Sequence, residues 1–381
     1  MNQRPKIAII GRGISGLSLA YRLIKRGCEP YIFGHVGSSL RASEAAQGVI
    51  CNKGLLWPRQ ALFQAKIRSL AWVKSWLSDI EAKTDCQVNK SFTGVFEPYR
   101  DPQDFHRIVQ RVYKNQFTGC FRSENLARDA LPEDMFAAAS FAGTLFYPGD
   151  GWFDPQQLMR ILEEYCLHNG AKIVVDDVLT IQPAKPQSEL VLTSGKTMQF
   201  DKIVIAAGQG SEKLLQSMQL GEISFFYHPG QVLKIKNSGF KRQWAMVRKT
   251  HSLVSRDALY LGSTTDKLKT ADQSWQPRER MHLWQILQEE FAWPGNQIED
   301  YDLEDLWGVR VRISDRQPVI GSLAALRPGQ AEWQQIYLMT GFYKNGLQLA
   351  DMASSWIEQE MFSESIDPQA QAFHVKRFQK A

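Results

Sequence analysis

The fold of this chain is decided by the stretch IAIIGRGISGLSLAYRLIKRGCEPYIFGH, residues 7 to 35. The apolar run at 6–10 predicts a short buried strand, and apolar residues at helical spacing between 15 and 25 predict a helix that stops at Gly27. A second apolar run at 30–33 predicts another strand. This is the order of a βαβ unit, so we expect two parallel strands joined by a right-handed crossover.

The loop between the first strand and the helix, Gly11-Arg12-Gly13-Ile14-Ser15-Gly16, fits the pattern GxGxxG. The first glycine allows a tight turn, the second lets backbone amides approach a pyrophosphate, and the third lets the helix pack closely on the strand. The helix N-terminus adds partial positive charge. Because a strand precedes the loop and a helix follows it, the sequence predicts a dinucleotide site.

The usual ribose-binding carboxylate is missing where the second strand ends, because the residue there is Gly34. Hydrogen bonds to a charged group contribute about 1–3 kcal/mol. Because that group is missing, we expect the ribose of the dinucleotide to be bound more weakly. Water, backbone, His35, Ser38 or Ser39 would then hold the hydroxyls, and Gly34→Glu should tighten binding. Arg41 lies too far along the loop to indicate NADP.

Composition narrows the class of protein. The net charge of +5 permits an anionic ligand or a nucleic-acid partner, but a solvated mixed surface is the simpler explanation. The five cysteines contain no CxxC pair, so we expect neither a metal site nor a disulfide framework. The N-terminus enters a strand without an apolar signal core, and no apolar run reaches the ~18 residues of a membrane span, so a cytoplasmic protein is expected.

Further elements follow from periodicity and turn residues. Asp154 and Pro155 are placed to begin a helix, and Gly170 to end it. Residues 228–265 alternate as antiparallel strands do, whereas 90–146 show no clear pattern. Helices are expected at 61–83, 154–168, 277–291 and 345–360, and strands at 172–175 and 201–208. With βα units at both ends of the chain, the middle is expected to be a second domain inserted into the first.

The segment RASEAAQG (41–48) resembles a signature of the D-amino-acid-oxidase-like flavoproteins, whose Ser and Ala amides lie along the FAD pyrophosphate. This family includes glycine oxidase, sarcosine oxidase and the FAD module of a tRNA wobble-uridine methylaminomethyl enzyme. The resemblance leaves residues 86–140 and 267–300 uncovered. Further segments resemble family motifs in the same order: YPGDGWFDPQQLMRILEEYCLHNGAKI (147–173), DKIVIAAGQGS (201–211), HPGQVLKI (228–235), YLGSTTD (260–266), GVRVRISDRQPVIG (308–321) and GFYKNGLQLAD (341–351).

The resemblance implies an α/β fold in which an FAD-binding, Rossmann-like parallel sheet is interleaved with an antiparallel-sheet substrate domain. The FAD-binding domain would comprise 1–85, 147–215 and 308–381, and the substrate domain 86–146 and 216–307. FAD would be non-covalent, because no cysteine follows the arginine motif. The implied cofactor-binding residues are Gly11, Gly13, Ile14, Ser15, Gly16, Arg41, Ala42, Ser43, Gln47, Gly48, Val178, Ala207, Gly208, Gly341, Lys344, Asn345, Gly346 and Leu347.

Members of the family oxidise a C–N bond, passing hydride from the carbon next to the amine to flavin N5. The cofactor supplies the difficult chemistry, so the protein must mainly orient the substrate. Arg310 falls on the family's carboxylate-binding arginine, and a guanidinium fork suits a carboxylate. The alternative is a salt-bridged arginine of the sheet, and Arg312 and Arg316 lie nearby.

Two further residues are catalytic candidates. Lys344 would lie near the flavin pyrimidine edge, where a cation stabilises the anionic reduced ring, unless it is a solvated loop lysine. Relatives have a carboxylate-binding tyrosine at about Ser252, which is too short for that role. The adjacent His251 could face the site, although a lone histidine on a strand is more often structural.

Three functions follow from the resemblance. The first is an FAD-dependent amine or amino-acid oxidase or dehydrogenase acting on a small amine that carries a carboxylate, with no membrane or metal partner. The second is oxidative removal of a carboxymethyl group from a modified tRNA wobble uridine. The turns at 147–152 and 315–318 resemble those of the tRNA-modifying module, and salt-dependent RNA binding would indicate this function. The third is a non-catalytic flavin-binding partner.

Overall fold

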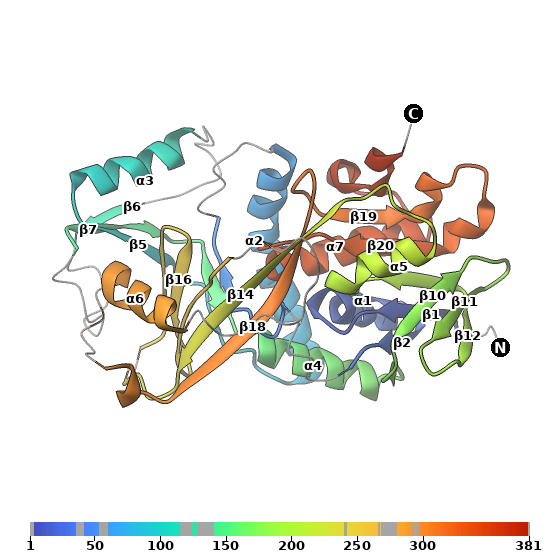
Figure 1. Ribbon diagram of the computed structural model, residues 1–381, viewed down its shortest axis with the longest axis horizontal. Coiled ribbons are helices and arrows are strands. Elements are labelled where there is room, and N and C mark those ends of the chain that lie inside the picture. The colour runs from blue at the N-terminus through green and yellow to red at the C-terminus, as the bar shows by residue number, and fades with distance from the viewer. Residues whose placement is uncertain are drawn as a thin grey trace.

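The computed structural model describes residues 4–35, 42–52, 60–114, 124–127, 141–239, 242–265, 267, 280–291, 293 and 297–379. Figure 1 shows two lobes, each built on one large sheet, and a long pair of strands that runs diagonally between them. We call them the parallel lobe and the antiparallel lobe after their sheets. The expected cofactor residue Arg41, with Ser38 and Ser39, lies outside the described residues.

The parallel lobe contains a six-stranded sheet in the order β19-β20-β13-β1-β2-β9. All neighbouring strands are parallel except β19 and β20. The expected βαβ unit is present and confirms the prediction of a parallel sheet. The strands are β19 (Val319–Ser322), β20 (Ile336–Thr340), β13 (Lys202–Ile205), β1 (Lys6–Ile10), β2 (Glu29–Phe33) and β9 (Lys172–Val174).

Alternating side chains of β1 enter two separate cores, as the pleat of a strand requires. Ile7 and Ile9 join residues of the helices on one face, whereas Ala8 and Ile10 join a small three-stranded sheet and α5 on the other. The parallel sheet is thus covered on both sides. The covering elements are α1 (Ile14–Lys25), α2 (Gln60–Thr84), α4 (Pro155–His168) and α7 (Gly346–Met361) on the first face, and β10 (Val178–Gln182), β11 (Ser188–Leu192), β12 (Thr197–Phe200) and α5 (Ser211–Ser217) on the second.

The antiparallel lobe contains an eight-stranded sheet in the order β18-β14-β17-β16-β15-β5-β7-β6. Only the β15–β5 pair is parallel. The antiparallel strands predicted at 228–265 are confirmed. Helices α3 (Pro102–Lys114) and α6 (Arg280–Phe291) belong to this lobe (Figure 1). The strands are β18 (Leu303–Ile313), β14 (Phe225–Ile235), β17 (Leu259–Gly262), β16 (His251–Ser255), β15 (Trp244–Arg248), β5 (Val95–Tyr99), β7 (Gly143–Tyr147) and β6 (Glu124–Ala127).

Three strands of this sheet lie in the stretch 90–146 that showed no sequence pattern. β5 contains Pro98 and has a single register pair with β15, Phe96 with Met246. Its main partner is β7, which is distant in the sequence. A short strand that depends on distant partners has little local signal, which explains why the sequence did not reveal it.

Strands β14 and β18 are paired along their whole length, from Phe225 with Ile313 to Ile235 with Leu303. This ribbon runs from the antiparallel lobe toward the parallel lobe (Figure 1). A smaller sheet, β3 (Val49–Ile50), β8 (Gly151–Phe153) and β4 (Lys90–Ser91), connects segments that are distant in the sequence. Asp154 caps α4 as expected, because its carboxylate accepts hydrogen bonds from the amides of Gln156 and Gln157 at 3.0 Å.

Candidate active site

The glycine loop is built by close backbone packing. A Cβ at Gly11 would overlap the carbonyl of Ala206, and φ at Gly11 is +124°, a conformation that disfavours other residues. A Cβ at Gly16 would overlap the carbonyl oxygen of Gly11. A Cβ at Gly13 would come within 3.2 Å of the Ser43 hydroxyl. These glycines therefore let the loop, the helix and the 42–48 segment meet closely.

The N-terminus of α1 is left open to an anion. Its N-cap residue is Gly13, which has no side chain to cap the helix, and the first turn contains no acidic residue. The Ile14 amide donates to the Ser43 hydroxyl at 3.2 Å, which brings the segment with Ala42 to the same point. The amides that follow Ile14 in the first turn and the helix dipole suit a pyrophosphate, so this chain's own residues fit the phosphate group of a dinucleotide.

Gln47 connects the two lobes, and Gly48 allows close packing beside Phe153. The Gln47 side-chain amide donates to the carbonyls of Ser252 and Tyr260 at 2.9 and 2.8 Å, and the Ser252 hydroxyl donates back to Gln47 at 2.5 Å. A Cβ at Gly48 would overlap the carbonyl oxygen of Phe153. The Gln47 side chain is thus engaged by protein, so we expect a contact of Gln47 with a cofactor to use its backbone.

Arg12 fills the space beside Gly34. A Cβ at Gly34 would lie 3.2 Å from Arg12 Cβ, and φ at Gly34 is +148°. The Arg12 side chain is buried and pairs with Glu163 of α4 through Nε at 2.6 Å and also through Nη2. A larger residue at position 34 would be strained and crowded, so the structure argues against the expected tightening by Gly34→Glu. His35 Nε2 lies 3.4 Å from Asp177 Oδ1.

The remaining expected cofactor residues lie at ends of parallel-lobe elements. Val178 begins β10, and Ala207 and Gly208 follow β13. Gly341 follows β20 with φ +77°, and Asn345, Gly346 and Leu347 form the start of α7. The N-cap Asn345 makes no side-chain cap bond, and the first turn of α7 contains no acidic residue, so this helix also begins with an N-terminus suited to negative charge.

Arg310 lies on β18 opposite His228 of β14. Its guanidinium covers Gly230, where any Cβ would overlap both terminal nitrogens, and its Nη1 donates to the carbonyl of Thr264 at 3.1 Å. No carboxylate among the described residues forms an ion pair with it. Burial lowers the pKa of Arg310, although a guanidinium keeps its charge at neutral pH. Arg310 is therefore a positioned cation that lacks an acidic partner in the described chain.

The loop after β20 brings Lys344 to Arg310. The Tyr343 amide donates to the Val311 carbonyl at 2.9 Å, φ at Tyr343 is +53°, and the Tyr343 ring lies 5.0 Å from that of His228. Lys344 Nζ lies 5.8 Å from the centre of the Tyr343 ring. Desolvation and the charge of Arg310 lower the pKa of Lys344 to about 8, but the side chain is exposed, so solvent weakens both effects.

His251 is the first residue of β16, and the charge of Lys344 acts on it. Burial and the charge of Lys344 lower the pKa of His251 to about 4, so the imidazole is neutral at pH 7. Its neighbour Lys249 pairs with Glu290 instead. The charge of Arg310 thus acts on Lys344 and that of Lys344 on His251, whereas no direct contact among these three side chains is present in the described part of the chain. Sequence reasoning missed Gly230, Thr264 and Tyr343, because their roles depend on strand register and a positive φ.

A buried polar network behind the start of α7 was also missed. The Gln348 amide donates to Asn52 Oδ1 at 2.9 Å and to the Lys66 carbonyl at 2.8 Å. The Lys66 ammonium donates to the Cys51 carbonyl at 3.1 Å, and the Asn52 amide donates to Asp150 at 2.9 Å. Burial lowers the pKa of Lys66 and raises that of Asp150. Buried polar residues on different elements have no distinctive sequence pattern, so only the structure reveals them.

A family profile and several curated proteins are similar to this chain. The DAO family profile, described as FAD dependent oxidoreductase, matches residues 6–359. The bifunctional protein ThiO/ThiG of Trichormus variabilis is 22% identical over 393 residues, covering 98% of this chain and 55% of that protein. Glycine oxidase of Bacillus licheniformis is 24% identical over 358 residues, covering 92% of this chain and 91% of that protein.

A solved structure matches the fold over nearly the whole chain. The iminodiacetate oxidase IdaA from Chelativorans sp. BNC1 superimposes with a TM-score of 0.82 at 18% identity, covering 97% of this chain and 98% of that one. The chain spans about half the length of the ThiO/ThiG relatives it matches, 55% in each case. In the described part of the chain, no helix is long and apolar enough to cross a membrane, and no group of three or more His, Cys, Asp or Glu is arranged for a metal ion.

Proposed function

The chain belongs to the DAO family of FAD-dependent oxidoreductases, and from that premise we propose that it oxidises the C–N bond of a small amine carrying a carboxylate. The observation that carries the proposal is Arg310, whose guanidinium is held by Gly230 and Thr264 without an acidic partner in the described chain. A fork of this kind binds a carboxylate with two charge-assisted hydrogen bonds. The names of two relatives, glycine oxidase and iminodiacetate oxidase, support a substrate of this class.

The residues proposed to hold FAD are those whose geometry suits its pyrophosphate and its ring. The open N-terminus of α1 with Ser43 would hold the FAD pyrophosphate, and the start of α7 would place partial positive charge near the ring. FAD, when bound, supplies the acceptor for the hydride that leaves the carbon next to the amine. We propose non-covalent binding, because the sequence has no cysteine after Cys166.

The protein's own contribution is orientation and electrostatics. Arg310 fixes the carboxylate, and thereby the direction of the neighbouring C–N bond. The Thr264 carbonyl fixes the guanidinium, and the glycine at position 230 leaves room for it. His251 is neutral at pH 7 and can donate or accept a hydrogen bond without adding charge. Since C–N oxidation leaves extra negative charge on the acceptor, the nearby Lys344 favours the reduced state.

Anaerobic reduction of the purified holoprotein tests the proposal. The protein should show a flavin absorption spectrum, and acid precipitation should release all flavin to the supernatant. Among a panel of amines, those with a carboxylate next to the amine carbon should bleach the flavin band. Bleaching only by amines without a carboxylate, or by none of the panel, would contradict the proposal. If no amine of the panel bleaches the flavin, salt-dependent tRNA binding would support the wobble-uridine alternative, whose carboxymethyl group also carries a carboxylate.

A further inference from the structure

The ribbon formed by β14 and β18 has an apolar face and a polar face. Val309 and Val311 enter an apolar core on the first face. Arg310 alternates with them, so it lies on the second face together with His228, its direct partner on β14. Arg312 lies on the same face, and its Nε donates to His228 Nε2 at 3.2 Å. The imidazole is thus held beside Arg310 on the polar face of the ribbon.

Tyr343 reaches this polar face from the loop between β20 and α7. Its ring meets the ring of His228 edge to face, with the ring centres 5.0 Å apart. Its amide donates to the Val311 carbonyl at 2.9 Å, and the preceding residue, Phe342, forms a β-bridge with Arg312. Backbone and ring contacts therefore fix the Tyr343 side chain on the face of the ribbon that carries Arg310.

The hydroxyl of Tyr343 is not used by the protein. Within the described residues, no group forms a hydrogen bond with it, and the side chain is half-buried rather than enclosed. Other tyrosines of the fold differ, since the Tyr147 hydroxyl donates to Glu97 at 2.6 Å and the Tyr227 hydroxyl donates to Glu212. A tyrosine with a fixed ring and an unbound hydroxyl has a donor that a ligand can use.

Arg310 has unused donors on the same face. Its Nη1 bonds the Thr264 carbonyl, and its other N–H groups have no partner in the described chain. Burial lowers the pKa of Arg310, and Tyr343 acts on it in the opposite direction, which agrees with a phenol close to the guanidinium. A carboxylate has two oxygen atoms that each accept more than one hydrogen bond, so a single carboxylate can use both side chains.

We infer that Tyr343 is a substrate-binding residue whose hydroxyl donates to the carboxylate that Arg310 binds. This inference rests on the proposed function and adds a second donor to its anion site. The two donors come from separate elements, β18 and the loop between β20 and α7. A neutral hydroxyl strengthens the binding of the anion without adding a charge that would repel the guanidinium.

Acetate binding to the holoprotein tests the inference without turnover, with affinity measured from the perturbation of the flavin spectrum. Tyr343→Phe should weaken acetate binding about 10-fold, because one hydrogen bond to a charged group is lost. The ring and its contact with His228 are retained, so FAD content and melting temperature should match the wild type. In the anaerobic assay, the concentration of a carboxylate-bearing amine that gives the half-maximal reduction rate should rise by a similar factor, with a smaller change in the limiting rate.

Tyr227→Phe is the matched control. Tyr227 lies next to His228 on β14 but belongs to the apolar face of the ribbon, where its hydroxyl bonds Glu212. Removing that hydroxyl should lower the melting temperature, because a buried bond is lost, and leave acetate affinity unchanged. Arg310→Lys is the positive control and should weaken acetate binding, because the guanidinium fork is lost.

The outcomes separate this inference from the proposed function. Unchanged acetate affinity in Tyr343→Phe, with a loss in Arg310→Lys, would overturn the role of Tyr343 and leave the proposed function standing. A Tyr343→Phe variant that binds FAD more weakly but keeps its acetate affinity would also overturn the inference, by assigning the hydroxyl to the flavin. A melting temperature as low as that of Tyr227→Phe would make the hydroxyl structural. Unchanged acetate affinity in both Tyr343→Phe and Arg310→Lys would remove the proposed function itself.

Discussion

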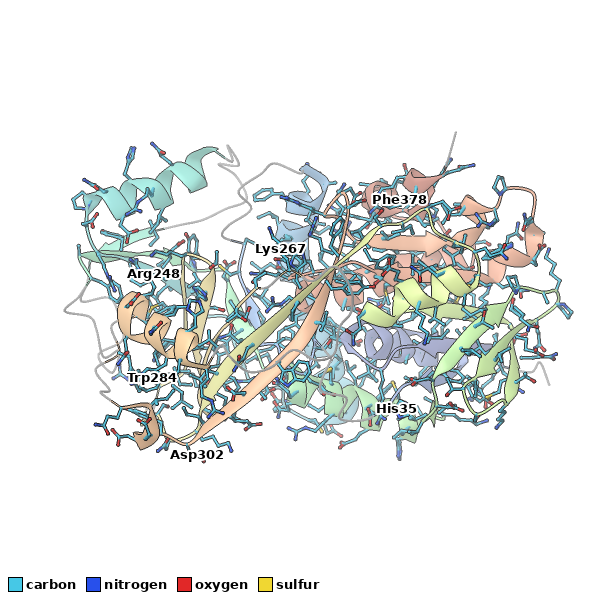
Figure 2. The ribbon with its side chains drawn as sticks, in the orientation of Figure 1. His35, Arg248, Lys267, Trp284, Asp302 and Phe378 are labelled. Carbon is cyan, nitrogen blue, oxygen red and sulfur yellow. The ribbon has the colours of Figure 1, made fainter. Side chains whose placement is uncertain are left out.

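Two arginines of the same eight-stranded sheet differ in their surroundings. Arg248, on β15, is buried and donates to Asp104 at 2.7 Å, to Glu290 at 2.9 Å and to the Pro98 carbonyl at 2.8 Å. Figure 2 labels it within the antiparallel lobe, away from His35 in the parallel lobe. Arg310, on β18, donates to one backbone carbonyl, and no carboxylate of the described chain pairs with it.

The difference shows how one residue type serves two purposes in one sheet. Arg248 is surrounded by acids from α3 and α6, so its charge is satisfied within the protein and holds those helices to the sheet. The position of the Arg310 guanidinium is fixed by Thr264, but its charge has no acidic partner in the described chain. The distinction lies in the partners, and it can be tested at both positions.

The largest expected effect is on stability at Arg248. Arg248→Met would leave Asp104 and Glu290 without their partner, so the free energy of unfolding should fall by about 3–5 kcal/mol, the usual cost of breaking a buried pair. Urea denaturation of the variant and the wild type measures this. A loss below about 1 kcal/mol, typical of exposed pairs, would mean that Arg248 is no more structural than a surface arginine.

The same pair predicts an acid-dependent loss of stability. Burial acts to raise the pKa of Asp104, but the hydrogen bond and charge of Arg248 outweigh it and the pKa is lowered. A carboxylate with a lowered folded-state pKa stabilises the protein above its unfolded pKa, and that stability is lost as pH falls through the folded pKa. Arg248→Met should remove this contribution, so its curve of unfolding free energy against pH should be flatter on the acid side.

Arg310 should behave in the opposite way. Arg310→Lys keeps the charge but loses the fork, so the reacting carbon would be misplaced and anaerobic flavin reduction should slow at least about 100-fold. FAD content and urea stability should stay near the wild-type values, because the side chain has no acidic partner to leave unpaired. A large loss of stability with unchanged reduction kinetics would make Arg310 a second structural arginine and erase the contrast with Arg248.

A smaller effect concerns Lys344 and pH. Its folded-state pKa of about 8 means that the ammonium is charged below that pH and loses its proton as pH rises through it. The flavin midpoint potential of the wild-type holoprotein should therefore show an added decline above about pH 8, because the cation that favours the reduced ring loses its proton. Lys344→Gln should show no such decline. A midpoint potential with the same pH dependence in the wild type and in Lys344→Gln would separate Lys344 from the flavin.

The smallest effect is expected at Gly34, beside a third arginine. Arg12 resembles Arg248 in having an acidic partner, Glu163, and it occupies the space beside Gly34. Gly34→Glu should lower the unfolding free energy by about 1–2 kcal/mol, because a side chain is disfavoured at φ +148°. The FAD dissociation constant should not decrease. Tighter FAD binding in a stably folded variant would show that Arg12 leaves room for an acid there.

The sequence predicted the parallel lobe well because its signals are local. The strand, glycine loop and helix at 6–25 are consecutive, and the Asp154 cap is read from one residue and its neighbours. The three catalytic candidates came from a family resemblance. What holds them was not predictable, since Gly230 matters only because β14 pairs in register with β18, and Tyr343 only because its backbone has a positive φ. Both facts depend on contacts between distant parts of the chain.

The hydrogen bonds of segment 42–48 connect the two lobes. Ser43 meets the start of α1, where a phosphate group is expected, and Gln47 bonds both β16 and β17 of the other sheet. The segment therefore connects the proposed phosphate site to the sheet of the antiparallel lobe. If FAD and substrate bind as proposed, we expect occupancy of the two sites to be linked through this segment, and by reciprocity a bound substrate should slow the loss of FAD.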